Sequence, residues 1–126
     1  MDKRVMPTTS DRDLYSMIVE ERIYTLLPGK VPDYLRAYET EGLAIQKAML
    51  GTMVGYFSTE FGPLNQIVHL WAYRDLADRE ARRRRLGADP GWQAYVAKVR
   101  PLVVNQENKL LMPAAFSPNP LEGSAA

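Results

Sequence analysis

The segment NQIVHLWAYR, residues 65–74, limits the fold of this chain more than any other stretch of its sequence. Its β-branched and aromatic residues predict a β-strand, and side chains alternate between the two faces of a strand. One face carries Val68, Leu70 and Ala72, and the other carries Ile67, His69, Trp71 and Tyr73. Because both faces are apolar, the sheet that contains this strand needs a covering layer on each side.

Three further segments are predicted to be strands, at residues 16–26, 51–62 and 106–114. The first two are rich in β-branched or aromatic residues, and glycine or proline marks their ends. In the 51–62 strand, strict alternation puts Met53 and Phe57 on one face and Tyr56 on the other. This strand lies close in sequence to the 65–74 strand, so the two should pair as an antiparallel hairpin.

Two helical regions separate these strands. Apolar residues recur at helical spacing from residue 30 to about 47, although Gly42 marks a potential break. A second helix begins after Asp75, a good N-cap, and restarts at Asp89-Pro90. The order βαββαβ predicts an α+β, ferredoxin-like fold with a four-stranded antiparallel sheet and helices on one face.

The chain is expected to form one domain at residues 16–118, between a flexible leader (1–15) and a flexible tail (119–126). Helices on one face of its sheet leave the second apolar face uncovered. A contiguous apolar patch of this kind is typical of an interface. A second copy packed sheet to sheet would cover the patch, so we expect a homodimer.

Composition excludes several classes of function. Sixteen basic residues against fifteen acidic ones leave a formal charge of +1, which favours neither nucleic acid nor an anionic membrane as a partner. With no cysteine and one histidine, the chain has too few ligands for a zinc site, and we expect no metal and no cofactor. Haem is the exception worth checking, because one histidine suffices as its protein ligand. The sequence contains no run of about 20 apolar residues and no signal peptide, so we expect no membrane insertion and a cytoplasmic location.

Three stretches carry a resemblance to a known family: RIYTLLPGKVPDYL, GYFSTEFGPLNQIVHLWAYRDLADREARRRRLGADPGWQAYV and VNQENKLLMPA. Over residues 16–118 the chain resembles the NIPSNAP family, a branch of the dimeric α+β barrel superfamily. The resemblance implies two βαββαβ subunits whose sheets close into a shared barrel. It implies no particular reaction, since the family has no settled chemistry and its animal members are associated with mitochondria and vesicle trafficking. The wider superfamily includes cofactor-independent monooxygenases, isomerases and haem-binding enzymes.

His69 has two interpretations. It can be a core histidine whose ring nitrogens find neighbouring partners. It can also be a working group, because it shares a face with Trp71 and Tyr73 that could line a cavity. An unperturbed imidazole titrates near pH 6.5, which suits proton transfer. We take His69 and Tyr73 as candidate catalytic residues and Trp71 as a candidate ligand contact.

Arg22 and Tyr24 lie two residues apart on one face of the first strand and are candidate ligand-binding residues. An inward-facing arginine needs an anionic partner, because an unpaired buried charge is costly. Glu20 or Glu60 could be that partner. The alternative hypothesis is that Arg22 holds a carboxylate or enolate of a ligand.

Asn65, Gln106 and Asn108 are amides at or near predicted strand ends. Such amides commonly close turns or bind edge backbone groups, and Asn65 can fix the hairpin loop. Ligand contact is the other hypothesis, so all three join the candidate ligand-binding residues.

The run REARRRR, residues 79–85, resembles a nucleic-acid patch at first sight. Successive helical residues lie about 100° apart, so these arginines fan around the helix axis and form no stripe. We interpret the run as a solvated surface with ion pairs, and a docking site for a protein partner is the alternative.

Two functional hypotheses remain from the sequence. The first is a homodimeric module that binds a small organic ligand or a protein partner. The second is a small cofactor-independent enzyme of the monooxygenase or isomerase type, acting on a cyclic or carbonyl-bearing substrate with His69 as acid/base. In that enzyme Tyr73 or Arg22 would steady the developing charge.

Overall fold

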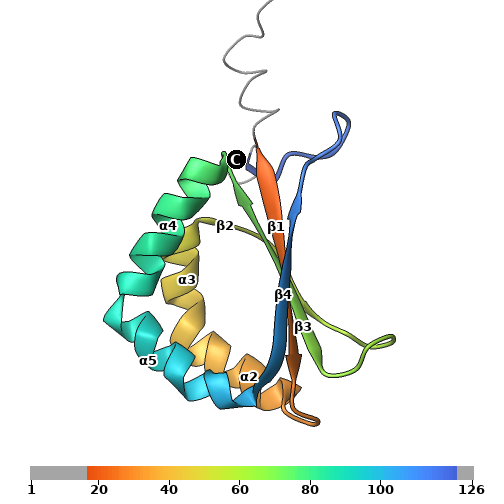
Figure 1. Cartoon of the computed structure of the whole chain (residues 1–126), viewed down its shortest axis with the longest axis vertical. Coiled ribbons are helices and arrows are strands. Elements are labelled where there is room, and N and C mark those ends of the chain that lie inside the picture. Colours follow the sequence, from red (N-terminus) through yellow and green to blue (C-terminus); the bar gives the residue numbers. More distant parts are fainter. Residues whose placement is uncertain (1–16, 122–126) are drawn as a thin grey trace, which may run out of the picture.

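The computed structural model describes residues 17–121; the predicted leader and the last five residues of the predicted tail lie outside the described residues. Four strands form one antiparallel sheet in the order β2-β3-β1-β4. They are β1 (Ile18–Leu26), β2 (Thr52–Ser58), β3 (Gln66–Tyr73) and β4 (Val103–Leu111). All helices lie on one face of this sheet, so the ferredoxin-like βαββαβ prediction is confirmed (Figure 1).

The first helical arm joins β1 to β2. It consists of α2 (Val31–Ala37), a π-helical turn (Tyr38–Gly42) and α3 (Leu43–Leu50), so the potential break at Gly42 is a widened turn within a continuous arm. A side-chain carbon at Gly42 would lie 3.1 Å from ring atoms of both Tyr38 and Tyr95. Glycine therefore lets the second arm approach the first at this turn.

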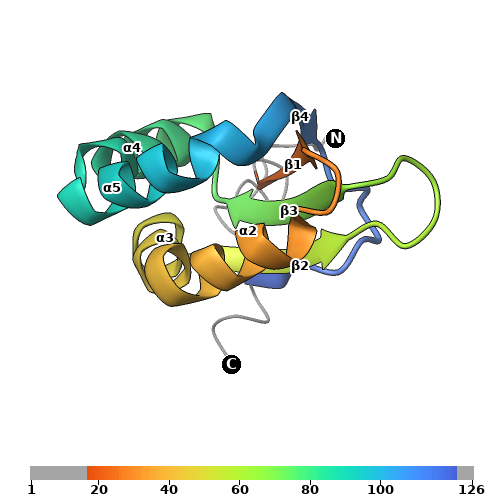
Figure 2. The ribbon, with the colours of Figure 1, turned by 90° about the horizontal axis from the view of Figure 1, so that it is seen from below.

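The second helical arm joins β3 to β4. It consists of α4 (Leu76–Ala88), α5 (Pro90–Val99) and a short 3₁₀ turn (Arg100–Leu102). Both predicted caps are confirmed: an Asp75 carboxylate oxygen accepts from Asp78 N at 2.7 Å, and Asp89 accepts from Trp92 N at 2.9 Å. Figure 2 shows the two arms side by side, with α3 next to α4. No helix in residues 17–121 is long and apolar enough to span a membrane.

Two details of the sheet correct the predictions. The register shifts between Met53 and Gly55, so Met53 faces Trp71 while Tyr56 faces His69 across the β2–β3 pair. This β-bulge puts Met53 and Tyr56 on the same face, and the prediction that Met53 shares a face with Phe57 was wrong. The 106–114 boundary was also wrong, because β4 pairs with β1 from Val103 onward and ends at Leu111.

The buried core lies between the sheet and the helices. It divides into two clusters, one around Tyr34, Ile67 and Tyr95 and the other around Trp71 and Leu86. The opposite face of the sheet carries half-buried and exposed apolar side chains, which we call the outer face. These side chains are Val19, Ile23, Phe57, Val68 and Leu70. The Phe57 side chain, 57% exposed, folds over Gly55 on this face.

Candidate functional site

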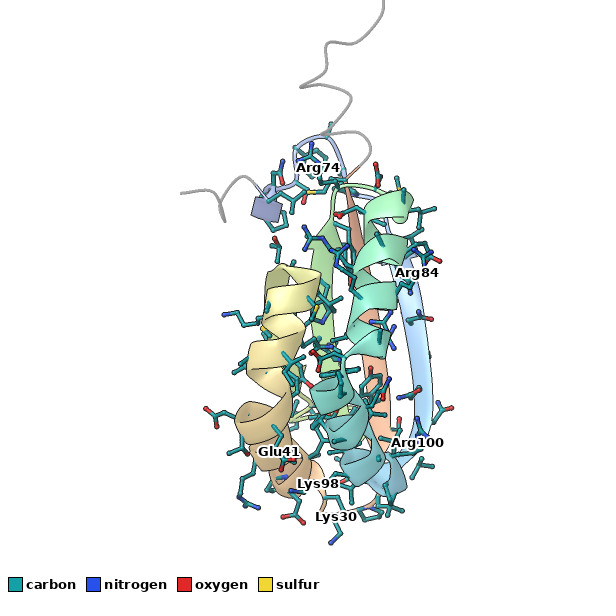
Figure 3. All side chains as sticks on the ribbon, turned by 90° about the vertical axis from the view of Figure 1, so that its left-hand side faces the viewer. Lys30, Glu41, Arg74, Arg84, Lys98 and Arg100 are labelled. Atoms are coloured by element: carbon teal, nitrogen blue, oxygen red, sulfur yellow. The ribbon has the colours of Figure 1, made fainter. Side chains whose placement is uncertain are left out.

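A cavity of about 570 Å³ lies between the sheet and the two helical arms. Its floor is formed by β1, β2 and β3, and its walls by the first arm and by α4 and α5. The exposed members of its lining gather at one edge: Arg100, Val104, Asn105 and Gln106. The mouth of the cavity therefore lies between the end of α5 and β4, where Figure 3 labels Arg100. The volume is within the range of small-molecule sites.

His69 lies at the centre of the cavity floor. It faces Arg22 on β1 and Tyr56 on β2 in the strand register, and only 1% of its surface is exposed. Its ring stacks on Tyr56 with centroids 4.6 Å apart and meets the edge of Tyr24 at 5.0 Å. The sheet thus holds the imidazole in one orientation from both sides.

A hydrogen bond from Trp71 determines the protonation of His69. The indole Nε1 donates to His69 Nδ1 at 2.8 Å, so Nδ1 carries no proton and the neutral ring is protonated at Nε2. Burial and, to a smaller extent, the positive charges of Arg22 and Arg83 together lower the pKa of His69 to about 3. His69 Nε2 is buried and has no partner among the described residues. At neutral pH His69 is therefore an uncharged hydrogen-bond donor.

Five tyrosines belong to the described residues that line the cavity: Tyr24, Tyr34, Tyr38, Tyr56 and Tyr95. Burial raises the pKa of Tyr34 to about 12 and raises the pKa of Tyr38, Tyr56 and Tyr95 as well. Tyr38 donates to Gln46 Oε1 at 2.6 Å, whereas Tyr95 Oη has no partner among the described residues. With raised pKa values, Tyr34, Tyr38, Tyr56 and Tyr95 remain neutral at physiological pH, and their rings form aromatic walls with hydroxyl groups.

Beside the cavity, on the same face of the sheet, Glu20 binds three side chains from three elements. Arg22 Nη1 donates to it at 2.9 Å, Arg79 donates through Nε and Nη2 at 3.1 and 3.0 Å, and Asn108 Nδ2 donates at 2.7 Å. Burial by itself would raise the pKa of Glu20, but these hydrogen bonds and the two arginine charges outweigh it and lower the pKa to about 2. Arg22 also donates to Tyr24 Oη at 3.0 Å. Glu20 is thus the anionic partner of Arg22.

Arg83 is a cavity residue that the sequence interpretation missed. Within the run 79–85, Arg79 and Arg82 form ion pairs and Arg84 and Arg85 are exposed, which agrees with a solvated surface. Arg83 instead lines the cavity, and its Nη1 is buried without a partner among the described residues. The sequence did contain a signal for this position. Residues three or four apart share a helix face, so Arg83 lies on the same face of α4 as Arg79 and the buried Leu86.

The structure places the other candidate residues in different surroundings. Gln106 lines the mouth of the cavity together with Asn105. Asn108 does not line it and binds Glu20 instead. Asn65, with a φ of 63°, accepts from Gly29 N at 3.3 Å through Oδ1 and so ties the hairpin loop to the β1–α2 turn.

Two aromatic candidates also lie outside the cavity lining. Tyr73 is 0% exposed and packs in the cluster of Trp71 and Leu86, and burial raises its pKa. Trp71 affects the cavity only through its hydrogen bond to His69. Within residues 17–121, no three histidine, aspartate or glutamate side chains come together in a group that could hold a metal ion.

The fold and the cavity define an α+β protein of ferredoxin-like topology with a ligand-sized space between its sheet and its helices. The chain belongs to the NIPSNAP family, whose sequence profile matches residues 19–118. Among curated proteins, it is 34% identical to NipSnap homolog 1 of Danio rerio over 103 residues, which are 82% of this chain and 36% of that protein. It is also 34% identical to the NipSnap homolog of Dictyostelium discoideum, covering 83% of this chain and 46% of that protein. The chain thus spans less than half the length of these two relatives.

Solved structures agree with this assignment. A NIPSNAP-like domain protein from Burkholderia xenovorans superposes with a TM-score of 0.82 at 53% identity, covering 83% of this chain and 91% of that chain. A NIPSNAP family protein with unknown function from Agrobacterium tumefaciens superposes with a TM-score of 0.80 at 50% identity, covering 82% of this chain and 94% of that chain. A protein from Nitrosomonas europaea, assigned by name to the antibiotic biosynthesis monooxygenases, superposes with a TM-score of 0.60 at 10% identity, covering 81% of this chain and 94% of that chain. That last likeness shows the shared fold alone.

Proposed function

We propose that this protein binds a small organic molecule in the cavity between its sheet and its helices. The observation that carries the proposal is the set of unpaired donors in an aromatic enclosure: His69 Nε2, Arg83 Nη1 and Tyr95 Oη. A buried donor that no protein group, water or ligand satisfies costs about 1–3 kcal/mol, so donors that line a cavity are expected to bind water or a ligand there. A ligand that accepts hydrogen bonds from them would remove that cost.

An enzyme is the second candidate function, because donors that line one cavity can also stabilise an oxyanion as it develops. The geometry favours a different role for His69 in such an enzyme than acid/base catalysis. Its Nδ1 already accepts from Trp71, and with a pKa of about 3 it is a weak base at neutral pH. In an enzyme His69 would therefore act as a neutral donor to a substrate oxygen.

A cavity-filling variant tests the binding function. Val96 and Ala97 are neighbours on α5; Val96 lines the cavity, whereas Ala97 is exposed and does not. The protein should be purified without denaturation, and any molecule released on unfolding identified by mass spectrometry. We expect Val96→Trp to abolish the bound molecule and Ala97→Trp to retain it, with both variants folded by circular dichroism. Equal retention by the two variants would place binding outside the cavity and refute the proposal.

We also propose that the protein is a homodimer that packs through the outer face of the sheet. Val19, Ile23, Val68 and Leu70 form an apolar patch on the two central strands, with Glu21 among them, and Phe57 adds an exposed ring on β2. A sheet that is apolar on the side opposite its helices is stabilised when a second sheet covers it.

A further inference from the structure

The geometry points to an organic anion as the ligand: we propose that Arg83 binds the carboxylate of a planar aromatic acid in the cavity. The inference rests on the proposed small-molecule function and adds the chemical class of the ligand and the residue that anchors it. Three features carry it: the charge balance of the lining, the lack of a partner for Arg83, and the flat aromatic walls.

The lining of the cavity carries positive charge without a compensating carboxylate. Among the described residues that line it are Arg22, Arg83 and Arg100, and no aspartate or glutamate. The nearest buried carboxylate, Glu20, already binds Arg22, Arg79 and Asn108. A cavity with this imbalance attracts an anion and disfavours a cation.

The three arginines differ in whether their hydrogen-bond donors and their charge are already paired within the protein. Arg22 donates two of its five N–H groups, through Nη1 to Glu20 and through Nε to Tyr24, and the Glu20 carboxylate compensates its charge. The half-buried side chain of Arg83 forms no hydrogen bond or ion pair with any described residue, and its Nη1 is buried. A buried guanidinium needs an anionic partner, and its planar fork matches the two oxygens of a carboxylate. Arg100 is exposed at the mouth, where solvent weakens its interactions.

The walls select a flat molecule. Tyr56 stacks on Tyr38, with ring centroids 4.5 Å apart, and on His69, at 4.6 Å, so its own faces are occupied; Trp92 and Tyr95, three residues apart on α5, have ring centroids 5.0 Å apart. Aromatic surfaces of this kind favour a planar ring by stacking and edge contacts. His69 Nε2 and Tyr95 Oη then offer neutral donors to a second oxygen of the same ligand.

A matched pair of probes separates charge from shape. 2-Naphthoate and 2-naphthamide have nearly the same planar outline, but only the first is an anion at pH 7. We expect calorimetry on the full chain to give an affinity roughly tenfold or more higher for naphthoate, as a charge-assisted bidentate contact allows. The preference should shrink as salt is raised, a readout that needs no variant.

The residue is tested by a neighbouring pair of arginines. Arg83→Gln should lower the naphthoate affinity roughly tenfold or more and leave the naphthamide affinity unchanged. Arg84→Gln is the control, because Arg84 is exposed on the surface of α4 and does not line the cavity (Figure 3). Arg83→Lys should recover part of the lost affinity, since it keeps the charge but not the planar fork.

Each outcome decides between the two proposals. Equal binding of both probes to the parent protein, or full naphthoate affinity in Arg83→Gln, would overturn the anion inference and leave small-molecule binding intact. Binding of neither probe at millimolar concentration, with no molecule found in the purified protein, would overturn the small-molecule function and this inference with it.

Discussion

At the scale of single residues, the hydrogen bond from Trp71 to His69 converts an expected acid/base group into a fixed donor. A histidine two positions from an indole on the same strand face can meet it directly, and here Nε1 and Nδ1 lie 2.8 Å apart. Burial among Tyr24, Tyr56 and two arginine charges then keeps the ring neutral. The electrostatics of the cavity therefore depend on Arg22 and Arg83 and not on this histidine.

Nuclear magnetic resonance can check this directly, because the chain contains one histidine. With a folded pKa of about 3, the His69 ring signals should stay constant between pH 8 and 5. Long-range proton–nitrogen correlation should identify the tautomer protonated at Nε2. Titration of these signals with a midpoint near pH 6.5 in the folded protein would contradict the assignment.

At the scale of elements, Glu20 connects β1 to α4 through Arg79 and to β4 through Asn108. It is 2% exposed and is held ionised by these donors and by Arg22. A carboxylate whose pKa falls from 4.5 to about 2 on folding contributes about 3 kcal/mol to stability at pH 7. This contribution is complete above pH 4.5 and is lost as the pH falls toward 2.

Glu20→Gln should therefore lower the free energy of unfolding by about 3 kcal/mol at pH 7, measured by urea denaturation. The difference from the parent protein should narrow as the pH falls from 4.5 toward 2, because Glu20 is protonated near pH 4.5 in the unfolded state but only near pH 2 in the folded state. His69 destabilises both folded states as the pH falls below 6.5, and because the Glu20 charge is the smallest of the influences on the pKa of His69, most of this effect cancels in the comparison. Glu80→Gln is the control: Glu80 pairs with Arg79 at the exposed surface, and its loss should change stability by less than about 1 kcal/mol. Equal effects of the two substitutions would rule out Glu20 as the link between the elements.

At the scale of the whole molecule, the proposed homodimer would form through the outer face of the sheet. Leu70 lies on this face of β3, opposite Gly55 on one side and Glu21 on the other. Light scattering coupled to gel filtration should give twice the chain mass for the parent protein. Leu70→Glu should give monomer or aggregate, because pairing the sheets would bury an uncompensated charge.

Leu76→Glu is the matched control for the assembly. Leu76 is an exposed leucine at the start of α4, on the helix side of the sheet. A glutamate there suits the helix N-terminus and should leave the dimer intact. A folded parent protein that elutes at the single-chain mass at micromolar concentration would refute the homodimer.

The sequence by itself determined the order of elements and the pairs of residues that share a face. Alternation, helical spacing and the caps at Asp75 and Asp89 are local properties of the chain, so they can be deduced from neighbouring residues alone. The sequence did not predict the bulge at Met53 or the π-helical turn ending at Gly42. The bulge depends on pairing with β3, and the turn depends on packing against Tyr95.

The tertiary structure alone decided which side of the sheet borders the cavity. Alternation places His69, Trp71 and Tyr73 together but cannot say which face the helices cover or where a space remains. Packing of the two helical arms left His69 at the cavity and Tyr73 in a closed cluster, although they are four residues apart on one strand face. The same packing places Arg83 in the cavity lining, whereas Arg84 and Arg85 are exposed to solvent. Such outcomes depend on contacts between residues far apart in the chain, and a local pattern carries no information about them.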